Sequence, residues 1–182
     1  MACDEISKLV DAAPEFLVLG FDMEWPFNIQ TGSGKTAVIQ ISPNLETCYV
    51  LQVSKLRNLP KALSELLAHP KTRITGINIK NDIKKLSRDF TGFDTAKIIN
   101  NCIDSGVLAN TILPFQNRWS MEKLITYLLN VKIDKNKKVR MSKWHVSPLS
   151  EEQLKYAATD SYASLLLYLE LKNREKQMDT NT

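Results

Sequence analysis

The chain has 182 residues and a formal net charge of +4, with 43% hydrophobic and 24% charged residues. This length suits one ordinary domain with a sizeable core, and the composition is that of a soluble globular protein. No apolar run is long enough to span a membrane, and the first residues lack the basic and apolar pattern of a signal peptide. The sequence therefore predicts no membrane partner, and its mild positive charge suits a polyanionic ligand without requiring one.

The cysteines give no sign of a disulfide framework or a zinc site. Cys3, Cys48 and Cys102 are odd in number, widely spaced and adjacent to no histidine pattern. The two histidines, His69 and His145, show no metal-ligand spacing and are expected in loops or on the surface. We therefore expect reduced thiols in an intracellular protein.

The chain divides into three predicted parts. Residues 1–15 form an N-terminal extension with a short helix, residues 16–173 form the main domain, and residues 174–182 form a flexible tail. The abrupt start indicates a piece cut from a longer chain.

The predicted elements of the main domain begin with a meander and then alternate. In chain order they are strands at 16–24, 36–42 and 47–53, a helix at 59–68, a strand at 73–78, a helix at 80–90, a strand at 101–104 followed by a helix capped by Ser105, a helix ending near Asn130, and a last helix from Ser150 to about Asn173. Ser120 is placed as a helix cap, and Ser150 with Gln153 matches a capping box. Three strands followed by alternating helices and strands predict an α/β fold with a mixed sheet and helices on its faces.

The first strand ends in two acids. Because strand side chains alternate, Asp22 and Glu24 share one face, roughly 6.6 Å apart along the strand, while Met23 and Trp25 face the core. Pro26 cannot continue the ladder, so the acids lie at the end of the strand, where sites are often built. Two such carboxylates can converge on a divalent ion, although acids at strand ends are usually just solvated.

A glycine-bearing segment after this strand resembles part of a phosphate-binding loop. Residues 31–36 read Thr-Gly-Ser-Gly-Lys-Thr, but Ile29 stands where the pattern needs its first glycine. The segment is followed by residues 37–41, which alternate as a strand does, whereas a phosphate-binding loop opens a helix. We therefore expect a flexible turn, and a nucleotide triphosphatase is a remote alternative.

Two further acids lie on predicted helices. Asp82 falls in the first turn of its helix, where it would also favour the helix dipole. Tyr156 and Asp160 are four residues apart on the last helix and so share one face, beside its apolar stripe. Aspartate is a poor residue for a helix interior, so Asp160 is expected to have a function there, although a salt bridge would also account for it.

Together, Asp22, Glu24, Asp82, Tyr156 and Asp160 resemble the motifs of the DEDD superfamily of 3′-to-5′ exonucleases, in the order in which that superfamily has them. The Tyr-x-x-x-Asp spacing is that of its tyrosine subfamily. The resemblance implies a ribonuclease H-like, DnaQ-like fold, with a mixed five-stranded sheet flanked by helices.

Within that subfamily the chain is most similar to the Werner-like exonucleases, a resemblance that covers roughly residues 16–172. It rests on Phe-Asp-Met-Glu-Trp-Pro at 21–26, on the basic stretch at 137–144 and on Tyr-Ala-Ala-Thr-Asp at 156–160. One departure is Lys84, where Werner-like domains have an aromatic residue.

The resemblance implies a reaction at two divalent ions, Mg²⁺ or Mn²⁺, for which carboxylates are suitable ligands. Asp22 would bridge both ions, Glu24 and Asp160 would complete one, and Asp82 would serve the other. Tyr156 would orient the attacking water, because a tyrosine pKa near 10 makes it a poor base at neutral pH. Asp104 also falls where the family often has an aspartate, and we expect it to be a cap or supporting residue.

A basic cluster precedes the last helix. Its members are Lys132, Lys135, Lys137, Lys138, Arg140 and Lys143. We expect Lys84, Lys137, Lys138, Arg140 and Lys143 to contact phosphates and Trp144 to stack on a base, although a lysine run is often only a solvated loop.

The sequence thus predicts a metal-dependent exonuclease that releases nucleoside 5′-monophosphates from DNA 3′ ends, single-stranded or recessed, in genome maintenance. By the same resemblance the protein would be nuclear and would act with a RecQ-type helicase as a separate chain. The alternatives are an RNA exonuclease of the ribonuclease D type and a catalytically silent nucleic-acid-binding scaffold.

Overall fold

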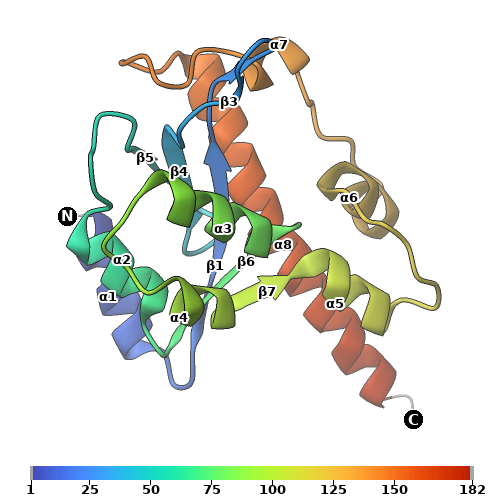
Figure 1. Ribbon diagram of the computed structural model, residues 1–182. Helices are drawn as coiled ribbons and strands as arrows, with labels where there is room; N and C mark the ends of the chain where they lie inside the picture. The colour runs from blue at the N-terminus through green and yellow to red at the C-terminus, as the bar shows by residue number, and fades with distance from the viewer. Residues whose placement is uncertain (1, 181–182) are drawn as a thin grey trace.

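Strand β1 (Leu17–Glu24) lies at the centre of a five-stranded sheet of order β5-β4-β1-β6-β7. The computed structural model describes residues 2–180, and Figure 1 shows helix α8 crossing this sheet beside β1. β1 pairs antiparallel with β4 and parallel with β6, and the sheet is therefore mixed. The predicted α/β fold with a meander at its start is confirmed.

The elements follow one another in the predicted alternation. The strands are β1 (Leu17–Glu24), β2 (Phe27–Asn28), β3 (Gly32–Ser33), β4 (Val38–Ser42), β5 (Tyr49–Gln52), β6 (Thr72–Gly76) and β7 (Cys102–Asp104). The helices are α1 (Ala2–Ala12), α2 (Lys61–Ala68), α3 (Ile79–Asp89), α4 (Thr95–Asn100), α5 (Ser105–Ile112), α6 (Met121–Leu129), α7 (Lys137–Arg140) and α8 (Glu151–Thr180).

The two faces of β1 have different neighbours. Leu19, Phe21 and Met23 are buried in the main core, together with Ile6 and Val10 of α1 and apolar side chains of α2 and α3. Gly20, Asp22 and Glu24 face α8 by strand alternation. The sheet therefore separates an apolar core from a layer in which carboxylates lie under one helix.

Helix α8 packs unusually closely on β1 at Gly20. A Cβ atom placed on Gly20 would lie 2.1 Å from the carbonyl oxygen of Ser161 and 2.9 Å from Cβ of Leu165. No side chain fits that space, and glycine is the residue that allows such an approach of two backbones. Ser161 also exchanges a hydrogen bond with Ser42 of β4, with 2.9 Å between the hydroxyl oxygens. These contacts fix the height of α8 above the acids.

The helix caps agree with the sequence at two of three positions. The Ser120 hydroxyl accepts a hydrogen bond from the N–H of Lys123, and Ser150 and Gln153 form the predicted reciprocal pair. The prediction that Ser105 caps α5 is wrong. Asp104 is the cap, because its carboxylate accepts hydrogen bonds from the N–H groups of Gly106 and Val107.

Other differences concern short or terminal elements. Helices α4 and α7 and the β2–β3 hairpin were not predicted from the sequence, since a few residues give too short a pattern to read. α8 continues to Thr180, past the predicted end near Asn173. Arg174, the first residue past the predicted end, donates hydrogen bonds to Glu170 and to the carbonyl of Leu128. The proposed boundary between the N-terminal extension (1–15) and the main domain (16–173) stays a prediction.

The Thr-Gly-Ser-Gly-Lys-Thr segment contains strand β3 and is tied to α3 at its last residue, Thr36. The Asp89 carboxylate accepts hydrogen bonds from the N–H and the hydroxyl of Thr36 and from the ammonium of Lys85. A phosphate-binding loop needs free N–H groups to bind an anion. Here the N–H of Thr36 already donates to the carboxylate of Asp89. The segment is thus not a phosphate-binding loop, and in place of the expected turn Gly32 and Ser33 form strand β3 of a short hairpin. Among residues 2–180, no helix is both long and apolar enough to cross a membrane.

Candidate active site

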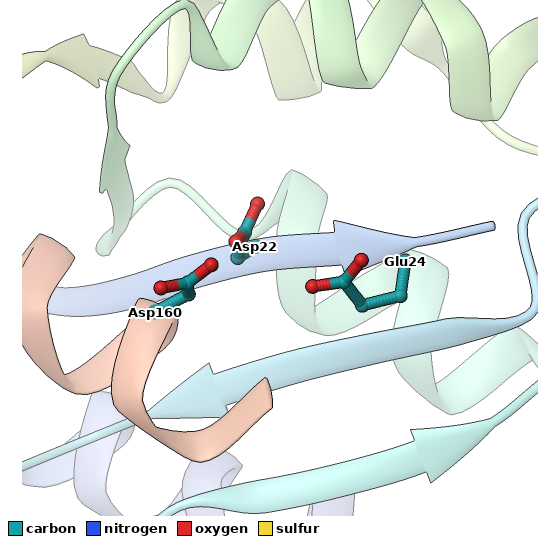
Figure 2. Close-up of side chains that lie close together, drawn as sticks. All are labelled: Asp22, Glu24 and Asp160. Atoms are coloured by element: carbon teal, nitrogen blue, oxygen red, sulfur yellow. The ribbon is translucent and has the colours of Figure 1, made fainter. Parts of the chain in front are cut away.

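Three carboxylates converge where β1 passes under α8. One oxygen each of Asp22, Glu24 and Asp160 lies within 4.8 Å of the others. Figure 2 shows Asp22 and Glu24 on one strand and Asp160 on the adjacent turn of the helix. The structure therefore brings the first and third acid motifs together.

Local structure accounts for this arrangement. Strand alternation places Asp22 and Glu24 on the α8 face, and the close approach of Gly20 to Ser161 brings Asp160 down to them. Asp160 is only 4% exposed as a whole residue, and Glu24 is 7% exposed. Acids so buried require a compensating partner.

The site is electrostatically unfavourable for ionised acids. Burial raises the pKa of Asp22 well above its ordinary value, and the carboxylates of Asp160 and Asp82 raise it further. Burial is also the main reason that the pKa of Glu24 rises to about 9, with Asp22 and Asp160 as further causes. Acids held this way favour either a proton or a cation between them.

Lys135 supplies one such cation. Its ammonium donates a hydrogen bond of 2.6 Å to Oδ1 of Asp160. The same ammonium opposes the rise in the pKa of Asp22 and of Glu24. Lys135 comes from the irregular segment between α6 and α7, and the sequence showed it only as one member of the basic cluster.

Asp82 lies near this group without joining the closest three. It is in the first turn of α3, as predicted, and contributes to the raised pKa of Asp22. Burial and then the carboxylate of Asp104 raise the pKa of Asp82 itself to about 7. Asp104 is thus a helix cap beside the site, in agreement with the supporting role expected for it.

Tyr156 lies one helical turn before Asp160, beside the acids. Burial, followed by the charges of Asp160 and Glu24, raises the pKa of its hydroxyl above the ordinary value. The Lys135 ammonium lies 5.4 Å from the centre of the Tyr156 ring. The hydroxyl therefore keeps its proton at neutral pH.

Trp144 does not have the predicted role. It is completely buried, its indole N–H donates to the carbonyl of Arg140, and its ring packs 6.0 Å from that of Tyr156. A side chain with no exposed surface cannot stack on a base, so that prediction is wrong. Trp144 instead packs α7 against α8 and supports Tyr156.

The acids lie in a cleft of about 560 Å³. Its basic lining side chains, among the described residues, are Lys135, Lys137 and Arg140, so two predicted phosphate ligands lie beside the acids. Lys84, Lys138 and Lys143 are exposed but are not among the residues that line this cleft. A basic rim around an acidic floor is suited to a phosphate chain that approaches a metal site.

The sequence model of the 3′-5′ exonuclease family matches residues 2–175. The 3′-5′ exonuclease of Drosophila melanogaster is 46% identical over 176 residues, which are 96% of this chain and 50% of that protein. The chain spans about half the length of such relatives.

Solved structures show the same fold at lower identity. NrnC of Brucella melitensis superposes with a TM-score of 0.71 at 21% identity, over 92% of this chain and 80% of that one. RNase D of Escherichia coli gives a TM-score of 0.70 at 19% identity, over 96% of this chain and 44% of that one. NrnC has also been solved with bound Mg²⁺ and bound to pGG.

Proposed function

Because the chain belongs to the 3′-5′ exonuclease family, we propose that its acidic cleft hydrolyses nucleic acids from their 3′ ends. The observation that carries this proposal is the convergence of Asp22, Glu24 and Asp160 within 4.8 Å. In the reaction, a water oxygen attacks the phosphorus of the last phosphodiester bond, and the bond from that phosphorus to the 3′ oxygen of the preceding nucleotide breaks. The water gives up a proton and the departing 3′ oxygen takes one up. The products are a nucleoside 5′-monophosphate and a chain shortened by one nucleotide.

The acids are suitable ligands for the divalent ions of such a reaction. Their oxygens are hard ligands of the kind that Mg²⁺ and Mn²⁺ prefer. Burial and then the neighbouring carboxylates raise the pKa of Asp22 and of Glu24, and a cation bound between these acids would oppose that rise. Asp22, Glu24 and Asp160 would hold one ion, and Asp22 with Asp82 would hold a second. The ions, when bound, would stabilise the negative charge that develops on the phosphate.

The remaining residues have separate tasks. Tyr156, whose hydroxyl stays protonated, would orient the attacking water by a hydrogen bond. Lys137 and Arg140, in the same cleft, would position the phosphates that precede the scissile bond. Lys84, Lys138 and Lys143 would act at a greater distance, as part of the electrostatic surface that attracts the polyanion.

For the substrate we propose DNA, in the tyrosine subfamily and close to the Werner-like exonucleases. The Tyr-x-x-x-Asp spacing of Tyr156 and Asp160 supports the subfamily. The stretches at 21–26, 137–144 and 156–160 support the likeness to the Werner-like exonucleases, on which the choice of DNA rests. A nuclear role in genome maintenance, with a RecQ-type helicase as a separate partner, belongs to the same proposal.

RNA is the alternative substrate, and specific observations favour it. Structural neighbours include RNase D and NrnC, the latter bound to pGG. The chemistry at phosphorus is the same for both sugars, so the choice depends on whether the cleft accepts a 2′-hydroxyl.

One assay separates the two substrates. A 5′-labelled strand with a recessed 3′ end is incubated as DNA and as RNA of the same sequence, with Mg²⁺, with Mn²⁺ or with chelator. We expect DNA to shorten stepwise from its 3′ end only when a divalent ion is present. Equal or faster shortening of RNA would assign the protein to the RNA exonucleases, and binding without cleavage of either would favour a silent scaffold.

A further inference from the structure

Gln40 is a completely buried side chain whose two polar atoms lack partners. Its relative exposure is 0%, and neither Nε2 nor Oε1 makes a hydrogen bond within the described structure. A buried amide without partners is costly, and buried polar groups in folded proteins generally have a hydrogen-bond partner. The position of Gln40 indicates which partner this is.

Gln40 lies directly beside the acids. In the register of the sheet, Gln40 of β4 pairs with Asp22 of β1. Residues paired in this way project from the same face, with Cβ atoms about 4.5–5.5 Å apart. The Gln40 side chain therefore lies on the α8 face, next to Asp22.

The neighbours of Gln40 along β4 confirm its place under α8. Val38, two residues before it, packs in one cluster with Tyr156 and Ala157. Ser42, two residues after it, exchanges a hydrogen bond with Ser161. Gln40 lies between these contacts and thus beneath the helical turn that carries Asp160.

We propose that Gln40 is a positioning residue of the metal site, whose amide donates a hydrogen bond to the carboxylate of Asp22 when a divalent ion is bound. A carboxylate offers four lone-pair sites and can serve an ion and a hydrogen-bond donor at once. The N–H of Met23 already donates to Asp22 from the backbone, and Gln40 supplies a donor from the neighbouring strand. Its neutral amide orients the acid without adding a charge that competes with the ion. This inference rests on the proposed function of the cleft.

The test is the affinity for Mn²⁺, measured by calorimetry on the whole chain. Gln40→Met keeps the length and burial of the side chain and removes its hydrogen bonds. We expect the Mn²⁺ dissociation constant to rise at least 10-fold, because loss of an outer partner of a metal ligand typically weakens binding about 10–100-fold. With nucleic acid, kcat should fall while KM stays near the wild-type value.

The chain offers a matched control. The Thr72 hydroxyl is also buried and without a partner, but it lies on β6 opposite Leu17, at the other end of β1 from Glu24. Thr72→Val removes a similar group far from the acids and should leave Mn²⁺ affinity unchanged. If Gln40 were only an unsatisfied core residue, the two variants would behave alike.

Three results are decisive. Unchanged Mn²⁺ affinity in a folded Gln40→Met variant would overturn the role of Gln40. If that variant does not fold, Gln40→Asn keeps the amide but withdraws it by one methylene, and wild-type affinity there would have the same consequence. Failure of the wild-type chain to bind Mn²⁺ would instead count against the proposed function of the whole cleft.

Discussion

The ammonium of Lys135 lies 2.6 Å from Oδ1 of Asp160, so the cluster of acids already contains one positive charge of the chain. The Asp160 side chain is 6% exposed and that of Lys135 is 28% exposed. Lys135 thus compensates a buried acid that a divalent ion would also neutralise. An ion bound there would compete with the lysine for the same carboxylate.

Replacing Lys135 with methionine should reveal this competition. Without the ammonium, Asp160 is left buried and unpaired, and we expect the metal-free chain to lose about 1.5–3 kcal/mol of stability. Mn²⁺ should bind more tightly, because no internal cation has to be displaced. Thermal unfolding and calorimetry measure the two effects, and Lys132→Met, at an exposed position of the same segment, serves as the control. Weaker Mn²⁺ binding in Lys135→Met would contradict the competition.

The spacing between α8 and β1 should be sensitive to a single methyl group. Gly20→Ala would place Cβ 2.1 Å from the Ser161 carbonyl oxygen, so the helix must move outward and carry Asp160 with it. We expect the free energy of unfolding to fall by about 1–3 kcal/mol, as for other overpacked cores. Mn²⁺ should also bind more weakly. Gly92→Ala is the control for Mn²⁺ affinity: its φ of +88° makes the change destabilising, but no atom lies within 4 Å of its Cβ position, so Mn²⁺ affinity should stay unchanged. The account fails here if Gly20→Ala leaves Mn²⁺ affinity unchanged.

The Tyr156 hydroxyl should affect the rate of cleavage but not the affinity for the divalent ion. Tyr156→Phe keeps the packing against Trp144 and removes the hydroxyl that orients water. We expect kcat to fall about 100-fold, at the low end for a group that directs proton transfer, with Mn²⁺ affinity unchanged. Tyr162→Phe is the matched control, on the same helix at an exposed position. Loss of Mn²⁺ binding in Tyr156→Phe would show that the hydroxyl has a different role.

The metal-free chain should lose stability as the pH rises. Glu24 has a pKa raised from 4.5 to about 9, and that of Asp82 is raised from 3.8 to about 7. At a pH below the ordinary pKa values of Glu24 and Asp82, both carboxyl groups are protonated in the folded and in the unfolded chain. Stability then does not depend on pH through these two groups. Between about pH 4 and pH 9 the unfolded chain releases these protons while the folded chain retains them, which favours unfolding.

Bound Mg²⁺ should reverse this trend, since it stabilises the ionised carboxylates. The rise in Tm caused by Mg²⁺ should therefore be larger at pH 8.5 than at pH 6, as measured by thermal unfolding across this range. Glu24→Gln should reduce the loss of metal-free stability with pH. If the rise in Tm caused by Mg²⁺ were the same at both pH values, Glu24 and Asp82 would not be the groups that keep their protons in the folded, metal-free chain.

The sequence was informative wherever the spacing of residues along one element determined the geometry. Period-two alternation placed Asp22 and Glu24 together, and the four-residue spacing on a helix paired Tyr156 with Asp160. The contact of Lys135 with Asp160 could not be predicted, because it joins an irregular segment to a helix and has no periodic pattern. Trp144 was misread for a related reason. Its basic neighbours suggested an exposed surface, but its indole is buried against Tyr156.

The register of the sheet set another limit. Gln40 belongs to a predicted strand, yet only the pairing of β4 with β1 shows that it lies opposite Asp22. A shift of one residue would have placed Gln40 on the opposite face. The Gly20 contact is similar, since a glycine within a strand does not reveal which helix approaches it.

The most direct test of the acidic cluster as the catalytic metal site is a comparison of wild type with Asp22→Asn. The substitution keeps the shape of the side chain and removes the charge shared by the proposed ions. Both proteins are checked for folding by circular dichroism and assayed for stepwise shortening of a 5′-labelled DNA strand and for Mn²⁺ binding. We predict that folded Asp22→Asn loses cleavage by at least about 1,000-fold, equivalent to about 4 kcal/mol of transition-state stabilisation, and binds Mn²⁺ more weakly. Wild-type cleavage by the folded variant would show that the reaction takes place elsewhere.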